Sequence, residues 1–358
     1  MRPSAVRMAG LPERVTVYEV GPRDGLQNEP VLVPLETKLQ LISRLVAAGL
    51  KAVEVTSLVR PDAVPQLADA EQLLARLPEG RGVRYSVLVP NRRGLDRALA
   101  LGVREIALFA SATESFAQRN LNRSRAESMR IFGDVAARAK EEGLAVRGYV
   151  SMCFGDPWEG DVDPAQVVGV ATELMAMGCQ EVSIGDTIGV ATPGAVSAML
   201  SRMVDAGVRL PALAVHFHDT YGQALSNTLE ALHCGITTVD ASAGGLGGCP
   251  FAHSATGNLA TEDLVFQLDG LGVMTGVDLT ALARTSLWLA EQLGRPSPSR
   301  TVQALAQTLG PRSDRPYRDG CSGEGPEGTG PGSEGAGPRG VGREGTGEKR
   351  TSSGRRQQ

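Results

Sequence analysis

The chain has 358 residues, of which 42% are hydrophobic, and a formal net charge of −4 at pH 7. These values are ordinary for a globular protein of one large domain or two. The weak negative charge argues against a general nucleic-acid or membrane-surface binder. No apolar stretch of the sequence is long enough to span a bilayer. We therefore expect neither a nucleic-acid partner nor a membrane partner.

The start of the chain and its cysteines bear on its compartment. Residues 1–14, which we expect to form an extension, hold no apolar core of signal-peptide length. The five cysteines are odd in number, scattered, and without any C-x-x-C spacing. A disulfide framework or a structural zinc site is therefore not expected. A reducing compartment fits, and the cytoplasm is the simplest one.

Eight short apolar runs alternate with amphipathic segments along residues 15–310. The runs are Val15–Val20, Lys51–Thr56, Val83–Val89, Glu105–Phe109, Ala145–Ser151, Glu181–Ile184, Ala212–His216 and Thr237–Asp240. Strands that alternate with helices pair in parallel through right-handed crossovers. Eight such units predict an α/β fold, a (β/α)8 TIM barrel. A doubly wound open sheet is the alternative, but no G-x-G-x-x-G follows the first strand.

The predicted helices are recognised by their ends. Four segments rich in Ala, Leu and Val run up to a glycine, which commonly closes a helix; they are Leu35–Ala48, Arg125–Glu142, Pro164–Met177 and Pro193–Ala206. Two C-terminal helices, Leu279–Leu293 and Thr301–Leu309, are expected outside the barrel. Residues 311–358 are rich in Gly, Pro and Arg and almost free of aliphatic residues. That composition predicts a disordered tail.

Polar residues gather where the predicted strands end, which is where TIM barrels form their sites. Asp24 follows the first strand, and His216 and His218 close the seventh. Residues two apart on a strand face the same way. One carboxylate oxygen with two imidazole nitrogens suits Mg²⁺, Mn²⁺, Zn²⁺, Co²⁺ or Fe²⁺, whereas the alternative is a turn aspartate and a hydrogen-bonded histidine pair. We predict a divalent-metal site, in which Asp219 is a candidate to orient one imidazole.

Three more residues are candidates for chemistry. Glu54 lies among aliphatic residues of the second strand, where a carboxylate needs a partner, so it either pairs with Arg23 or orients a substrate hydroxyl. Asp186, which follows the sixth strand, is either a site residue or the cap of a turn. Cys249 follows a glycine-rich loop that can close over a substrate. Its thiol either moves a proton or has no chemical role.

Four motifs occur in order along the chain. They are V-G-P-R-D-G-L-Q-N-E over 20–29, H-F-H-D-T-Y-G-Q over 216–223, G-L-G-G-C-P over 245–250 and G-N-L-A-T-E-D over 257–263. Together they resemble the 3-hydroxy-3-methylglutaryl-CoA (HMG-CoA) lyase family, metal-dependent TIM-barrel enzymes. The resemblance runs from about Val15 to Leu309, and the tail falls outside it.

The resemblance implies a reaction and a set of roles. The reaction is cleavage of HMG-CoA, an acyl-CoA, to acetoacetate and acetyl-CoA, as in leucine degradation and ketone-body formation, by a homodimer. Mg²⁺ or Mn²⁺ is held by Asp24, His216, His218 and Asn258. The implied catalytic residues are Arg23, Glu54, Asp186 and Cys249. Arg23 and Gln27 are implied to bind the substrate.

Two other functions stay open at this point. A relative acting on another acyl-CoA or on a 2-oxo acid would share the metal residues, although the cysteine loop favours the lyase. His253 stands where the family pattern has a small amide or polar residue, which could alter closure of that loop. A non-catalytic barrel that binds a ligand or partner is the remaining alternative.

Overall fold

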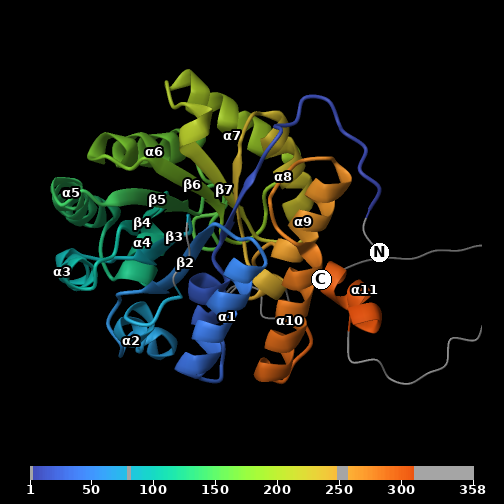
Figure 1. The fold of residues 1–358 in the computed structure, drawn as a ribbon. Coiled ribbons are helices and arrows are strands. Elements are labelled where there is room, and N and C mark those ends of the chain that lie inside the picture. Colours follow the sequence, from blue (N-terminus) through green and yellow to red (C-terminus); the bar gives the residue numbers. More distant parts are fainter. Residues whose placement is uncertain (1–2, 79–81, 248–256, 310–358) are drawn as a thin grey trace, which may run out of the picture. The chain divides into compact units, whose positions relative to one another are not determined.

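Eight parallel strands form a closed barrel in chain order, with the last strand hydrogen-bonded to the first (Figure 1). The computed structural model describes residues 3–78, 82–247 and 257–309. All of them belong to the first of two units into which the chain divides, Met1–Arg312. Cys249, His253 and the predicted tail lie outside the described residues. The predicted barrel is confirmed, and the open sheet is excluded.

The strands agree with the predicted apolar runs. They are β1 (Thr16–Glu19), β2 (Ala52–Ser57), β3 (Arg84–Leu88), β4 (Glu105–Ser111), β5 (Ala145–Ser151), β6 (Glu181–Asp186), β7 (Leu213–Phe217) and β8 (Thr238–Ala241). The placement of Asp186 after the sixth strand was wrong by a small margin. It is the last residue of β6, because the ladder with β7 continues to a pairing of Asp186 with Phe217.

Helices follow the strands as the pattern predicts. They are α1 (Leu35–Ala47), α2 (Ala70–Leu74), α3 (Arg92–Ala100), α4 (Glu114–Leu121), α5 (Arg125–Glu141), α6 (Pro164–Met177), α7 (Pro193–Asp205), α8 (Ala224–His233), α9 (Thr261–Gly270), α10 (Leu279–Leu293) and α11 (Arg300–Leu309). Local signals set their ends. In α6, Asp163 accepts a hydrogen bond from Ala165 N, Pro164 opens the first turn, and Gly178 closes the helix in the left-handed region.

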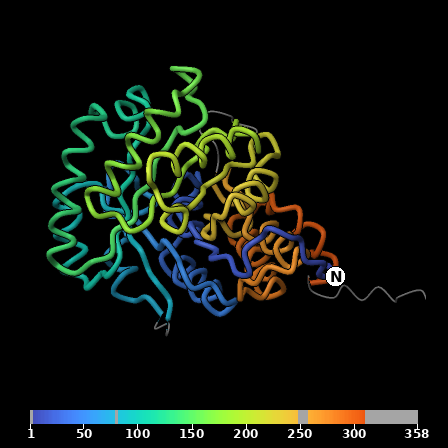
Figure 2. Tube along the Cα trace, turned by 90° about the horizontal axis from the view of Figure 1, so that it is seen from above, coloured from blue at the N-terminus to red at the C-terminus, as the bar shows by residue number. Residues whose placement is uncertain are grey.

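The two C-terminal helices predicted outside the barrel are confirmed. Helix α10, in orange, lies beside α1, in blue, in both views (Figures 1 and 2). Its amino end is fixed by Asp278, which accepts hydrogen bonds from Thr280 N and Ala281 N. A C-terminal helix therefore packs beside the first helix of the barrel.

The main apolar core lies outside the barrel wall, between the strands and the helices. The strand residues in it, such as Val53, Val55 and Ile106, alternate with residues that face the barrel interior. A second, small apolar cluster consists of Tyr18, Val20 and Ala52. The interior also holds buried charged residues. Arg147 on β5 pairs with Glu181 on the neighbouring strand β6 and with Asp240 on β8, which is not a neighbour of β5.

Candidate active site

A tight turn at the end of β1 carries two of the predicted site residues. The π-helical turn η1 (Gly21–Gly25) winds around one carbonyl, because the backbone N–H groups of Arg23, Asp24 and Gly25 all donate to Val20 O. A Cβ on Gly25 would lie 2.6 Å from Ser242 Oγ and 2.8 Å from Leu246 Cβ. The glycine is thus required for the turn to pack against the segment after β8, which fixes Arg23 and Asp24 at the mouth of the barrel.

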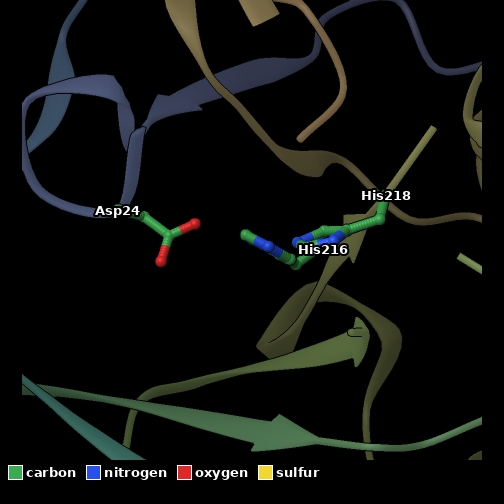
Figure 3. Close-up of side chains that lie close together, drawn as sticks. All are labelled: Asp24, His216 and His218. Carbon is green, nitrogen blue, oxygen red and sulfur yellow. The ribbon is translucent and has the colours of Figure 1, made fainter. Parts of the chain in front are cut away.

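The three predicted metal residues converge. Asp24 faces His216 and His218 from across the barrel mouth (Figure 3), and each offers a ligand atom within 4.8 Å of the others. The two imidazole rings lie 5.3 Å apart between centroids. His218 is buried, while Asp24 and His216 are partly buried. Their convergence from β1 and β7 follows from parallel strands that end at the same side of the barrel.

Asn258 joins this group through the segment that follows the glycine loop. This segment pairs with the end of β7, since Leu259 N donates to Phe217 O and Asn258 forms a β-bridge with His218. The amide nitrogen of Asn258 donates to Asp24 Oδ2 at 2.8 Å and to Leu246 O at 3.0 Å. Its oxygen, Oδ1, is buried with no hydrogen-bond partner among the described residues. An acceptor left unpaired in this place fits a cation ligand.

The electrostatics keep these groups in the protonation states that a cation needs. Burial alone would raise the pKa of Asp24, but Arg23, His216 and the Asn258 amide lower it to about 2. Burial, together with neighbouring His216, lowers the pKa of His218 to about 3. A carboxylate that stays ionised and an imidazole that stays neutral both keep lone pairs available.

Arg23 is held by carboxylates on two sides. Its Nε pairs with Glu54 Oε1, and its Nη1 lies 2.6 Å from Asp24 Oδ1. The other oxygen of Glu54, Oε2, accepts from the hydroxyl of Tyr149 at 2.8 Å. Burial would lower the pKa of Arg23, but Glu54 and Asp24 raise it, so the guanidinium stays charged. Of the two alternatives left open for Glu54, the pairing with Arg23 is present, and a role toward a substrate hydroxyl stays a prediction. Arg23 Nη2 has no partner in the described part of the chain.

Asp186 holds a turn. Its carboxylate accepts from Val190 N at 2.9 Å and from Ala191 N at 3.0 Å, and burial raises its pKa to about 6. Asp219 accepts from Ala224 N at the start of α8. Gln27 lies just beyond η1 and is half-buried. Because Cys249 is outside the described residues, its predicted role is neither supported nor opposed by these contacts.

Two buried glutamates that we did not single out from the sequence tie the site loops together. Glu19 Oε1 accepts from Gly21 N and from Ala243 N, both at 2.8 Å, and so joins η1 to the glycine loop. Glu262 accepts from Gly244 N at 2.8 Å and from the Ser286 hydroxyl. A glutamate within a buried strand was the available signal for Glu19, as it was for Glu54.

One large cavity lies away from this site. It has a volume of about 720 Å³ and lies at the opposite end of the barrel, where it is lined by residues such as Arg84, Glu105 and Glu181 from the starts of β3, β4 and β6. Cavity size therefore does not locate the chemistry, whereas the cluster at the strand ends does.

The fold and the cluster define a class, a TIM-barrel protein with a candidate metal centre at the carboxyl ends of its strands. The chain belongs to the HMGL-like family, whose model matches residues 14–288. It is 48% identical over 304 residues to the mitochondrial hydroxymethylglutaryl-CoA lyase of Homo sapiens, covering 85% of this chain and 93% of that protein. It is 47% identical over 302 residues to the cytoplasmic 3-hydroxy-3-methylglutaryl-CoA lyase of Rattus norvegicus, covering 84% and 87%.

Solved structures agree. The hydroxymethylglutaryl-CoA lyase of Pseudomonas aeruginosa superimposes with a TM-score of 0.81 at 46% identity, over 84% of this chain and 99% of that one. An HMG-CoA lyase from Acinetobacter baumannii, in complex with coenzyme A and 3-methylmalate, gives 0.78 at 33% identity, over 87% and 99%. The resemblance inferred from the four motifs is thereby confirmed.

Proposed function

We propose that this chain cleaves HMG-CoA to acetoacetate and acetyl-CoA. The observation that carries the proposal is the convergence of Asp24, His216, His218 and the unpaired Asn258 Oδ1 beside a charged, buried Arg23. Relatives at 47–50% identity over most of the chain are HMG-CoA lyases. A divalent cation and an arginine at one barrel mouth suit a reaction in which an alcohol proton leaves and an enolate forms.

The four ligand candidates fit Mg²⁺ or Mn²⁺. They supply a carboxylate oxygen and an amide oxygen, the hard ligands that these ions prefer, together with two imidazole nitrogens. When bound, the ion supplies a Lewis acid that lowers the pKa of the substrate's 3-hydroxyl. Asp24 remains ionised at neutral pH because of its low pKa, and it is steadied by the Asn258 amide.

The chain's own residues then handle the charge that develops. The carboxylate of Asp186, as the proposed general base, takes the hydroxyl proton as the C2–C3 bond breaks. C3 becomes the ketone of acetoacetate, and the electron pair of the broken bond forms the enolate of acetyl-CoA. Arg23, held by Glu54, presents its guanidinium to the enolate oxygen, which is preorganised stabilisation of the oxyanion kind. Gln27, next to this turn, contacts the substrate.

Proton movements complete the reaction. Glu54 positions Arg23 and the hydroxyl, and Asp186 holds the turn after β6 next to the site, with a carboxyl pKa of about 6 that allows exchange near neutrality. The thiol of Cys249 delivers a proton to the enolate carbon, giving acetyl-CoA. This last role rests on the resemblance of the glycine-loop motif.

A substrate panel tests the proposal. Purified protein with Mg²⁺ is offered HMG-CoA and, separately, other acyl-CoA substrates and 2-oxo acids with acetyl-CoA, and the products are identified by mass spectrometry. We expect acetoacetate and acetyl-CoA from HMG-CoA with the highest kcat/KM. Faster cleavage or condensation of a sibling substrate would overturn the assignment.

We further propose that residues 15–310 act as the catalytic domain of a cytoplasmic homodimer, with residues 1–14 as an extension and 311–358 as a tail. The scattered cysteines without C-x-x-C spacing support a reducing compartment, and the named relatives include a cytoplasmic form. Among the described residues, no helix is long and apolar enough to cross a membrane. Sedimentation of the whole chain, compared with a chain ending at residue 310, tests the dimer and the tail together.

A further inference from the structure

A buried carboxylate on β8 lies against one of the candidate metal ligands. Asp240 Oδ2 is 3.3 Å from His216 Nδ1, and the Asp240 side chain is fully buried, whereas that of His216 is 12% exposed. This approach falls short of a regular hydrogen bond, and Nδ1 has no other partner among the described residues. The closeness itself still bears on the ring, because two lone pairs that face each other repel.

Arg147 and Ser183 hold the carboxylate of Asp240 in place. Arg147, on β5, donates to Asp240 Oδ1 at 2.6 Å and to Oδ2 at 3.2 Å, and the Ser183 hydroxyl donates to Oδ2 at 2.8 Å. The guanidinium of Arg147 is only 2% exposed and also reaches Glu181 at 2.7 Å. Two-pronged arginine–carboxylate pairs fix both partners in orientation. The carboxylate therefore cannot turn away from His216.

Aromatic rings fix the arginine in turn. The guanidinium carbon of Arg147 lies 3.9 Å from the ring centroid of Tyr18 and 4.6 Å from that of Tyr149. Since β5 and β8 are not neighbours in the barrel, the contact between Arg147 and Asp240 crosses the interior. A chain of charged contacts thus runs from Glu181, at the start of β6, through Arg147 and Asp240 to His216 at the carboxyl ends of the strands.

We propose that Asp240, braced by Arg147, is the positioning residue that holds the proton of His216 on Nδ1 and leaves Nε2 free as the metal-binding nitrogen. A neutral imidazole carries one proton, and its tautomer is set by the group that the other nitrogen faces. A carboxylate accepts and cannot donate. Asp240 therefore selects the tautomer in which Nδ1–H points at Oδ2.

The inference rests on the proposed metal site. Two measurements distinguish a failure of the inference from a failure of the metal site. The first is the Mn²⁺ dissociation constant of the full chain, measured by electron paramagnetic resonance of the free ion. In Asp240→Asn the amide donates to Nδ1 and drives the proton to Nε2, so we expect affinity weaker by about 10–100-fold. Thr238→Val is the matched control, on the same strand two residues earlier, and should bind within about twofold of the wild type.

The second measurement needs no variant to fold. Nitrogen NMR of ¹⁵N-histidine-labelled, chelator-stripped wild-type chain reports which ring nitrogen of His216 carries the proton, with His216→Gln to assign the signal. We expect the proton on Nδ1. A proton on Nε2, or a folded Asp240→Asn variant with wild-type Mn²⁺ affinity, would overturn the inference. If Asp240→Asn does not fold, the tautomer of the wild type alone decides the inference. If the wild type binds no Mn²⁺, the tautomer again decides the inference, and the missing affinity counts against the proposed metal site.

Discussion

Tyr149 donates its hydroxyl hydrogen to Glu54 at 2.8 Å, from the opposite side of the barrel, and so occupies the one carboxylate oxygen that Arg23 leaves free. Both oxygens of Glu54 are therefore engaged, and its side chain is fully buried. A carboxylate fixed in this way is suited to hold Arg23 in one place. Arg23 links Glu54 to the candidate metal ligands, because it also contacts Asp24.

Tyr149→Phe tests this arrangement. The change removes one hydrogen bond to a charged group, which is worth about 1.5–3 kcal/mol. If this free energy is lost in the transition state, kcat should fall by roughly 10–100-fold. The affinity for Mn²⁺ should stay close to that of the wild type. Tyr85→Phe is the control, because that hydroxyl donates to Pro78 O outside the site. A steady-state rate for Tyr149→Phe equal to that of the control would count against positioning of Arg23 through Glu54.

His216→Ala should abolish tight metal binding. The change removes one of the converging ligand atoms at the strand ends, and a divalent site that loses a protein ligand typically loses most of its affinity. His233→Ala, at the exposed end of α8, serves as the matched histidine control. Titration with Mn²⁺ distinguishes the two variants. Tight binding in His216→Ala would show that the ligand assignment is wrong.

Cys249→Ser should separate proton delivery from metal binding. A hydroxyl is a far weaker acid than a thiol, so we expect kcat to fall by at least about 100-fold, the usual contribution of a general acid. Mn²⁺ affinity should stay within a few-fold, since Cys249 is not among the proposed ligands. Cys234→Ser, at the carboxyl end of α8, is the control. Full turnover in Cys249→Ser would remove the thiol from the mechanism.

The convergence of the candidate metal ligands could be predicted from the sequence because each lies at the end of a strand, and a closed parallel barrel brings all such ends to one side. Asp24, His216 and His218 needed no further information. Arg147 and Asp240 could not be paired in advance. They lie 93 residues apart on strands that are not neighbours. Their contact therefore depends on the closure of the barrel and on the distance across its interior, and neither can be read from the sequence.

The loop-binding glutamates were missed for a related reason. Glu19 and Glu262 accept from the backbone N–H groups of Ala243 and Gly244, and the sequence does not show which backbone groups a side chain will meet. The position of Glu19 within a buried strand was the one available signal. Asn258 was found only through the resemblance, because the β-bridge that brings it to His218 follows a loop rather than a strand. Helix bounds, by contrast, were close to correct wherever a glycine or a capping residue marked the end.

The stability of the folded chain should fall as pH rises, through Glu262. Burial raises its pKa from 4.5 to about 8. Between these values the folded chain keeps the proton and the unfolded chain has lost it, so ionisation costs stability throughout that window and not below it. One such group contributes a slope of up to about 1.4 kcal/mol per pH unit. Glu19, with a pKa raised to about 7, acts in the same direction.

Glu262→Gln should flatten that dependence, because the amide cannot ionise. Urea unfolding of the wild type and the variant at several pH values between about 5 and 8 measures the two slopes. Glu141→Gln, which changes an exposed acid at the end of α5, should keep the wild-type slope. A Glu262→Gln slope as steep as that of the wild type would mean that the buried carboxyl does not hold its proton in the folded chain.

The most direct test of the central claim is acetoacetate release from HMG-CoA by chelator-stripped protein, measured before and after Mg²⁺ or Mn²⁺ is added. We predict almost no product before addition and full turnover afterwards, with His216→Ala inactive in both conditions. Equal turnover with and without the ion, or no turnover by folded protein under either ion, would contradict a metal-dependent HMG-CoA lyase built on Asp24, His216, His218 and Asn258.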